Sequence, residues 1–193
     1  MKYFSTTARR VVAVAAAAAV AGLAISTAAY AATSSGTAST APTAIPKCTA
    51  FDLGVWVAVG EGNGAAGTIY YPLQFTNVSR HTCSLFGYSG VSALDRNGHQ
   101  LGSPANWGSR AGARTVYLAP GATAHTLLAY HDAAVTTEPG CDPVFSTALL
   151  RVYPPDQRQS TFAEFSLEAC SHAGPIYMSI IEPIRAGVGT ING

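Results

Sequence analysis

Residues 68–76 read TIYYPLQFT, and every second side chain in this stretch is large and apolar. The apolar series is Ile69, Tyr71, Leu73 and Phe75. A period of two residues is that of a strand with one buried face, because successive side chains of a strand point to opposite sides. Residues 51–59, FDLGVWVAV, repeat the alternation from Phe51 to Val59. The two stretches predict half-buried strands and point to an all-β protein.

Shorter apolar or alternating segments predict further strands. They are residues 83–86, 91–96, 115–118, 124–130, 149–153, 163–169 and a last strand at 176–180. Beyond residue 47, no window of a dozen residues has the 3.6-residue period of a helix. About eight short strands separated by Gly and Pro are typical of an antiparallel, immunoglobulin-like β-sandwich. A closed barrel is the alternative.

Two local signals refine the strands. Asn97-Gly98 lies between Leu94 and Leu101 and predicts a hairpin with a type I′ turn, in which both central residues have positive φ. Pro72 has no N–H to donate to a ladder. It therefore predicts that its strand is an edge strand or contains a bulge.

The first part of the chain has the features of an export signal. Arg9 and Arg10 precede an alanine-rich apolar run and the small-residue triplet at 29–31, so residues 1–31 are predicted to be a signal peptide. Residues 32–46 read as a flexible Ala/Thr/Ser-rich leader, and residues 47–190 as a single domain. The prediction is a secreted or cell-wall-associated protein; Sec and twin-arginine export stay open.

Charge and anchoring signals exclude several classes of partner. Without Lys2, Arg9 and Arg10, the chain keeps eight basic and ten acidic residues, which leaves no basic stripe for nucleic acid. We predict no transmembrane span, because no later apolar run is long enough. No lipid anchor is expected either, because the first cysteine is Cys48.

All four cysteines lie in the predicted exported domain, where an oxidising compartment favours disulfides. Four cysteines allow three pairings. We favour Cys48–Cys83 and Cys141–Cys170, because each pair joins segments that flank neighbouring predicted strands.

Residues 87–91, GYSGV, come within one residue of the G-x-S-x-G turn that presents a nucleophilic serine. That turn needs a strand before it, a helix after it and a parallel sheet, and the chain has no such pattern. We therefore interpret Ser89 as part of a bend. With no convergent acid, base or metal-ligand set in the sequence, we predict no catalytic residues, no metal and no cofactor, and expect that the protein is not an enzyme.

The two tryptophans are the remaining candidates. Trp56 falls on the outward face of its strand, and we expect a loop or second layer to bury it. Trp107 lies in the polar segment 102–114 with Arg110 and Arg114, where it either plugs the end of the sandwich or contacts a ligand. Trp107, Arg110 and Arg114 are therefore the predicted ligand-binding residues.

The segment CSLFGYSGV at 83–91, which has the form C-x-L-x-G-Y-x-G-V, resembles a block of a known family, as do the segments around Cys48 and Cys141. The family comprises exported actinobacterial domains of unknown function, and the resemblance covers residues 48–184. Its members usually have proline where this chain has Ser89, which implies a turn. The resemblance supports the fold and the compartment and leaves the function open.

The leading functional hypothesis is a non-enzymatic secreted or cell-wall-associated binding module with an unknown extracellular or wall ligand, since a sandwich of this kind works through its loops and faces. An extracellular hydrolase with a site assembled across strands is the first alternative. A secreted protease inhibitor that presents a disulfide-braced loop is the second.

Overall fold

The computed structural model describes residues 44–61, 63–108, 112–132, 139–146 and 149–190. Chain contacts divide the protein into two units, Met1–Ala41 and Pro42–Gly193. The predicted signal peptide and residues 32–43 of the predicted leader lie outside the described residues. Among the residues that are described, no helix is long and apolar enough to cross a membrane.

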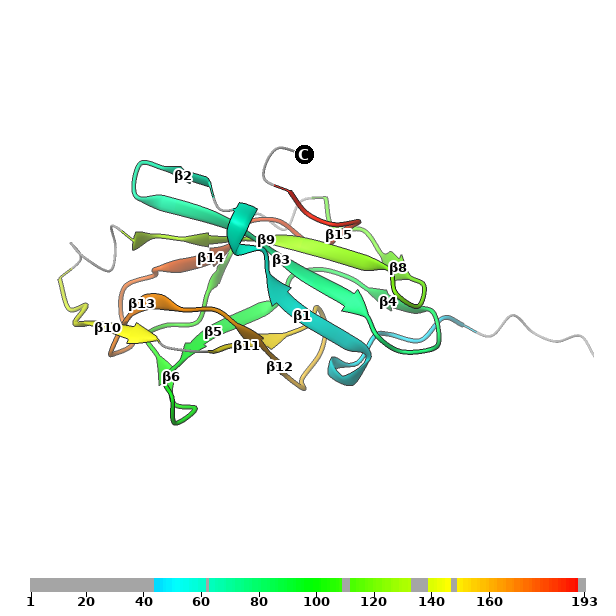
Figure 1. Ribbon diagram of the computed structural model, residues 1–193, viewed down its shortest axis with the longest axis horizontal. Helices are drawn as coiled ribbons and strands as arrows, with labels where there is room; N and C mark the ends of the chain where they lie inside the picture. Colours follow the sequence, from blue (N-terminus) through cyan, green and yellow to red (C-terminus); the bar gives the residue numbers. More distant parts are fainter. Residues whose placement is uncertain (1–43, 62, 109–111, 133–138, 147–148, 191–193) are drawn as a thin grey trace, which may run out of the picture. The chain divides into compact units, whose positions relative to one another are not determined.

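The second unit is built from β-strands, and its largest sheet has seven (Figure 1). The main path runs in the order β1-β3-β9-β14-β7, while β2 pairs with β3 and β15 pairs with β9. The strands are β1 (Leu53–Val57), β2 (Asn63–Ala65), β3 (Thr68–Asn77), β7 (Asn106–Trp107), β9 (Thr123–Tyr130), β14 (Met178–Ile180) and β15 (Arg185–Ala186). All pairs are antiparallel except β14 with β7, which is parallel.

A four-stranded antiparallel sheet has the order β12-β11-β5-β6, and two further sheets have two strands each. The four strands are β5 (Gly90–Leu94), β6 (Gln100–Leu101), β11 (Leu149–Tyr153) and β12 (Thr161–Glu164). The small sheets pair β4 (Cys83–Leu85) with β8 (Val116–Leu118), and β10 (Pro143–Ser146) with β13 (Leu167–Cys170). Two 3-10 turns, η1 (Ala50–Asp52) and η2 (Val59–Glu61), flank β1.

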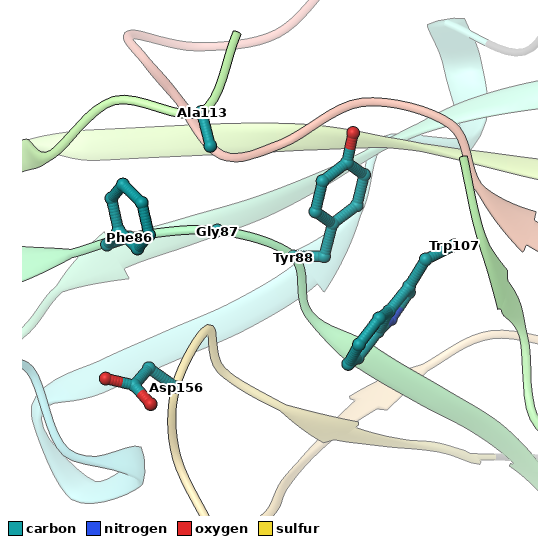
Figure 2. Close-up of a pocket in the computed structure, with 6 residues that line it drawn as sticks. All are labelled: Phe86, Gly87, Tyr88, Trp107, Ala113 and Asp156. Carbon is teal, nitrogen blue, oxygen red and sulfur yellow. The ribbon is translucent and has the colours of Figure 1, made fainter. Parts of the chain in front are cut away.

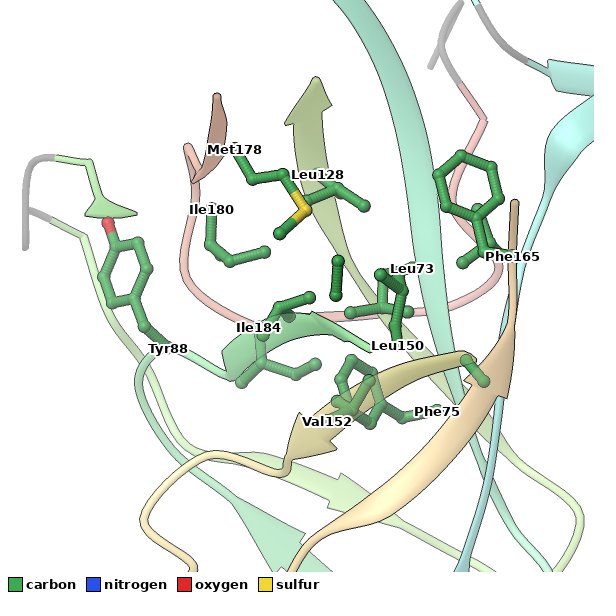
Figure 3. Packing of buried hydrophobic residues seen from close by; sticks show 14 of the residues in the cluster. Leu73, Phe75, Tyr88, Leu128, Leu150, Val152, Phe165, Met178, Ile180 and Ile184 are labelled. Atoms are coloured by element: carbon green, nitrogen blue, oxygen red, sulfur yellow. The ribbon is translucent and has the colours of Figure 1, made fainter. Parts of the chain in front are cut away.

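The hydrophobic core lies between the two larger sheets (Figure 3). The face of β3 that carries Leu73 and Phe75 packs toward Leu150 and Val152 of β11, and all four side chains are buried. The apolar residues of the predicted β3 alternation therefore face the core, and the residues between them face outward. The predicted all-β fold is confirmed. Two packed, largely antiparallel sheets are consistent with the predicted immunoglobulin-like sandwich.

Both predicted disulfides are present. Cys48 is bonded to Cys83 and Cys141 to Cys170, across 35 and 29 residues of chain, respectively. The first bond fastens the start of the domain to β4, beside the parallel bridge between Lys47 and Ser84. The second links Cys141, which lies just before β10, to Cys170, the last residue of the paired strand β13.

The first predicted strand is shorter than its alternation suggests. Phe51 lies in η1 and is 81% exposed, and Val59 lies in η2 and is 63% exposed. The N–H and hydroxyl of Thr49 both donate to the carboxylate of Asp52, which closes a capping turn before the strand begins. A local hydrogen-bonded turn therefore overrides the alternating pattern at the start of β1.

The prediction of an edge strand at Pro72 is wrong, because β3 is a central strand with β9 on one side and β1 and β2 on the other. The carbonyl of Pro72 accepts the N–H of Ala58, just beyond β1. In an antiparallel strand the N–H and C=O of one residue point the same way. The position where Pro72 lacks an N–H therefore points to the side of β3 on which β1 has ended and β2 has not yet begun. The hydrogen bonds between β3 and β9 do not require an N–H from Pro72.

The hairpin at Asn97-Gly98 exists, since β5 pairs with β6, but its turn is not type I′. Only Gly98 has a positive φ, of 82°. The carboxylate of Asp95 accepts the N–H groups of Asn97 and His99 and shapes a longer loop.

The number of strands is also larger than expected. The described residues form fifteen strand segments, where about eight were predicted, and β15 follows the strand expected to be last. The predicted strand at 163–169 is divided between β12 and β13, which belong to different sheets. Its alternating residues Ala163, Phe165, Leu167 and Ala169 are nevertheless all buried.

Candidate functional site

Trp107 is held in place by a short parallel pairing at the edge of the seven-stranded sheet. Trp107 pairs with Ile180 of β14, and the next residue, Gly108, donates its N–H to the Ile180 carbonyl at 2.8 Å. A Cβ on Gly108 would lie 2.7 Å from the carbonyl oxygen of Ile181. Only glycine allows this close approach of two backbones, which fixes the direction of the neighbouring indole.

The indole of Trp107 is anchored by its polar edge and presents its ring. The Nε1–H group donates to the carbonyl of Ser89 at 2.9 Å. The ring lies beside the buried Tyr88, with 6.3 Å between the ring centroids, and Trp107 as a whole is 48% exposed. Because the N–H is engaged, the side chain offers the face of an aromatic ring to a ligand.

Two hollows meet at Tyr88 and Trp107. The first has a volume of about 480 Å³ and is lined by Phe86, Gly87, Tyr88, Trp107, Ala113 and Asp156. The second has a volume of about 360 Å³ and is lined by Tyr88, Gly90, Trp107, Tyr153, Pro154, Asp156, Gln157 and Arg158. We call the two together the aromatic pocket. Figure 2 shows Tyr88 and Trp107 side by side in the first hollow, with Phe86 on the same segment as Tyr88.

The polar groups of the aromatic pocket come from the loop between β11 and β12. Asp156 lines both hollows, has a positive φ of 60° and forms an ion pair with Lys47. Gln157 and Arg158 follow it on the second hollow, and Arg158 is exposed. The aromatic pocket therefore combines apolar rings with a polar, charged rim, which is the usual composition of a small-molecule or polymer subsite.

A family model described as a domain of unknown function, DUF4232, matches residues 48–176. The chain belongs to the DUF4232 family. Comparison with curated proteins and comparison with solved structures each found no match. All the described residues that line the aromatic pocket lie within the matched residues, and thus within the DUF4232 domain.

The structure separates the three predicted ligand-binding residues of the DUF4232 domain. Trp107 lines both hollows. Arg114 is exposed and follows the lining residue Ala113, but is not itself among the described lining residues. Arg110 lies outside the described residues. Within the described ranges, no three His, Cys, Asp or Glu side chains gather as a metal ion would require.

Sequence reasoning missed most of the aromatic pocket. Phe86 is 53% exposed, and its position in the C-x-L-x-G-Y-x-G-V block was an available signal. Tyr153 and Asp156 carried no signal, because they reach the pocket only through the pairing of β11 with β5.

Trp56 is a second half-exposed tryptophan on another surface. It is 45% exposed, so the expected burial is wrong. It lines a hollow of about 400 Å³ on the outer face of the seven-stranded sheet, together with Val59, Val188 and Gly189. Residues 187–190 cross this face, where the side-chain amide of Gln74 donates to the carbonyl of Gly189 and accepts its N–H. The tail lies beside Trp56 without covering it.

Ser89 is fully buried, and its hydroxyl has no hydrogen-bond partner in the described part of the chain. Its carbonyl is the group that anchors Trp107. The side chain therefore lies out of reach of a substrate from solvent, and the serine acts through its backbone.

Replacing Ser89 by alanine is expected to leave stability unchanged or to raise it by up to about 1 kcal/mol, because an unpaired buried hydroxyl is removed. Ser89→Pro is expected to be tolerated or to stabilise by about 0.4–1 kcal/mol, through a less flexible unfolded chain. Urea unfolding of both variants measures this. A loss above about 1 kcal/mol in Ser89→Pro would contradict a proline-compatible bend at this position.

Proposed function

We propose that this DUF4232 domain is a secreted binding module that takes the saccharide chain of a cell-envelope polymer in its aromatic pocket. The observation that carries the proposal is the presentation of Trp107. Its indole N–H is bound to Ser89, its ring is half exposed, and it stands between two adjoining hollows. A sugar ring has one apolar C–H face that packs on an aromatic ring and hydroxyls that need polar partners.

The arrangement of the aromatic pocket suits a chain of sugar units. Tyr88, Trp107 and Asp156 belong to both hollows, so one polymer can continue from the first hollow into the second. Phe86 adds an aromatic ring to the first hollow, and Tyr153 adds one to the second. Asp156, Gln157 and Arg158 supply hydrogen-bonding groups along one rim.

Secretion is part of the proposal. The two disulfides are of the kind that forms and persists in oxidising compartments outside the cytoplasm. The predicted signal peptide at residues 1–31 supports the same location.

Trp107→Ala is expected to lower the affinity for purified cell-wall polysaccharide about 10- to 100-fold, because a central aromatic anchor is removed. Its stability should fall by only about 1 kcal/mol, since a half-exposed ring and one hydrogen bond are lost. Binding is measured by isothermal titration calorimetry with the mature protein, and stability by urea unfolding.

Trp56→Ala is the matched control, because Trp56 has nearly the same exposure and lies in a different hollow. Its affinity should stay within about twofold of wild type. Equal loss in both variants, or binding unaffected by Trp107→Ala, would contradict the proposal. The recovered polysaccharide is also analysed for cleavage; turnover by the wild type would instead assign the domain to the predicted alternative of an extracellular hydrolase.

A further inference from the structure

We infer that the aromatic pocket selects an anionic saccharide, one that carries carboxylate or phosphate groups, over a neutral one. The inference rests on the proposed function and adds the chemical class of the ligand. It comes from the balance of charges at the pocket.

The charged side chains among the described lining residues of the aromatic pocket are Asp156 and Arg158. Asp156 is the one carboxylate among the described lining residues, and its charge is matched by the ammonium group of Lys47. Arg158 lines the second hollow, and Arg114 follows the lining residue Ala113 of the first. After the ion pair is counted, the exposed guanidinium group of Arg158 remains among the described lining residues, and the exposed Arg114 is next in the chain to one of them.

The positive charge that remains among the described lining residues of the pocket contrasts with the slightly negative net charge of the protein outside the predicted signal peptide. Outside the predicted signal peptide, the chain carries eight basic and ten acidic residues. The cationic character of the pocket is therefore a local property and not a consequence of overall charge. Guanidinium groups bind carboxylate and phosphate oxygens through paired N–H donors, beside a ring that packs on the sugar.

Substitutions at Asp156 and Arg158 change the charge of the pocket in opposite directions, so they should change the affinity for an anionic ligand in opposite directions. Replacing it by asparagine removes the one negative charge among the described lining residues and releases Lys47 from its ion pair, so the pocket becomes more cationic. Replacing Arg158 by glutamine has the opposite effect. Each charge change near an exposed site should alter the affinity for an anionic ligand about 3- to 10-fold at low salt, and less at high salt.

The experiment titrates the mature wild-type protein with three probes. Oligogalacturonate carries carboxylates, its methyl ester has the same sugar chain without the charge, and glucose-substituted poly(glycerol phosphate) carries phosphates. We expect one or both anionic probes to bind at least about fivefold more tightly than the methyl ester at low salt. The anionic probe that binds more tightly distinguishes a carboxylate ligand from a phosphate ligand.

The variants make the outcome decisive. Arg158→Gln should weaken anionic binding, and Asp156→Asn should strengthen it. Both should change binding of the methyl ester less than binding of the anionic probes, because each substitution keeps a hydrogen-bonding side chain and the methyl ester carries no charge. A general loss of structure cannot produce the gain in Asp156→Asn. Equal binding of charged and neutral probes, with Trp107 still required, would overturn this inference and keep the proposed function. Absence of Trp107-dependent binding to all three probes would overturn both.

Discussion

Replacing Cys48 and Cys83 together by alanine is expected to lower the free energy of unfolding by about 4 kcal/mol. Both residues are completely buried, and their disulfide closes a loop of 35 residues. Chain-entropy reasoning assigns a loop of that length roughly 4 kcal/mol, through the freedom that its opening returns to the unfolded chain. Two sulfur atoms are also lost from the core.

The measurement is urea unfolding of the mature protein without reductant, followed by tryptophan fluorescence. Cys141→Ala with Cys170→Ala is the matched comparison, because it opens a loop of similar length, 29 residues, and Cys141 is only partly buried. Its loss should be about the same or slightly smaller. A loss below about 1 kcal/mol in the Cys48–Cys83 variant would show that the start of the domain is held by other contacts.

Gly102→Ala is expected to destabilise the domain by about 2–4 kcal/mol. Gly102 has a φ of 58°, a conformation that costs an alanine about 1–2 kcal/mol. The added Cβ would also lie 2.5 Å from Cε1 of Tyr177 and 3.1 Å from the carbonyl oxygen of Cys170. Overpacking of this kind costs about 1–3 kcal/mol.

Tyr177 has little freedom to move away from that Cβ. Its ring is fully buried, and its hydroxyl donates to the carbonyl of Leu101 at 2.8 Å. Burial, reinforced by the neighbouring Tyr130, raises the pKa of the Tyr177 phenol above its ordinary value, so the hydroxyl remains a donor. The clash therefore falls on a well-anchored core side chain.

Gly98→Ala separates the two contributions. Gly98 also has a positive φ, of 82°, but no atom of the described residues lies within 4 Å of the place that an added Cβ would take. This variant should lose only about 1–2 kcal/mol, the cost of the backbone conformation. Urea unfolding of both variants gives the difference. Equal losses would mean that the Tyr177 ring shifts at no cost and that the core beside Gly102 is loosely packed.

The strand alternation and the disulfide pairs could be predicted because both depend on local features. In β3, the burial of Leu73 and Phe75 follows from the opposite directions of successive side chains, which any strand must obey. The cysteines flank segments that read as neighbouring strands, so the pairing Cys48–Cys83 followed from chain order. The expected membership of a family of domains of unknown function is confirmed by the family match over residues 48–176.

Tertiary structure alone decided where the aromatic pocket lies. Phe86, Trp107 and Asp156 come from three separate loops and strands, and the parallel pairing of β7 with β14 that positions Trp107 joins residues far apart in the chain. It also decided that Pro72 could sit in a central strand, because its missing donor faces the interval between β1 and β2. Alternation reports which face of one strand is buried, whereas these features depend on which strands become neighbours. Packing between residues that are distant in the chain determines which strands become neighbours, and a local sequence pattern does not predict it.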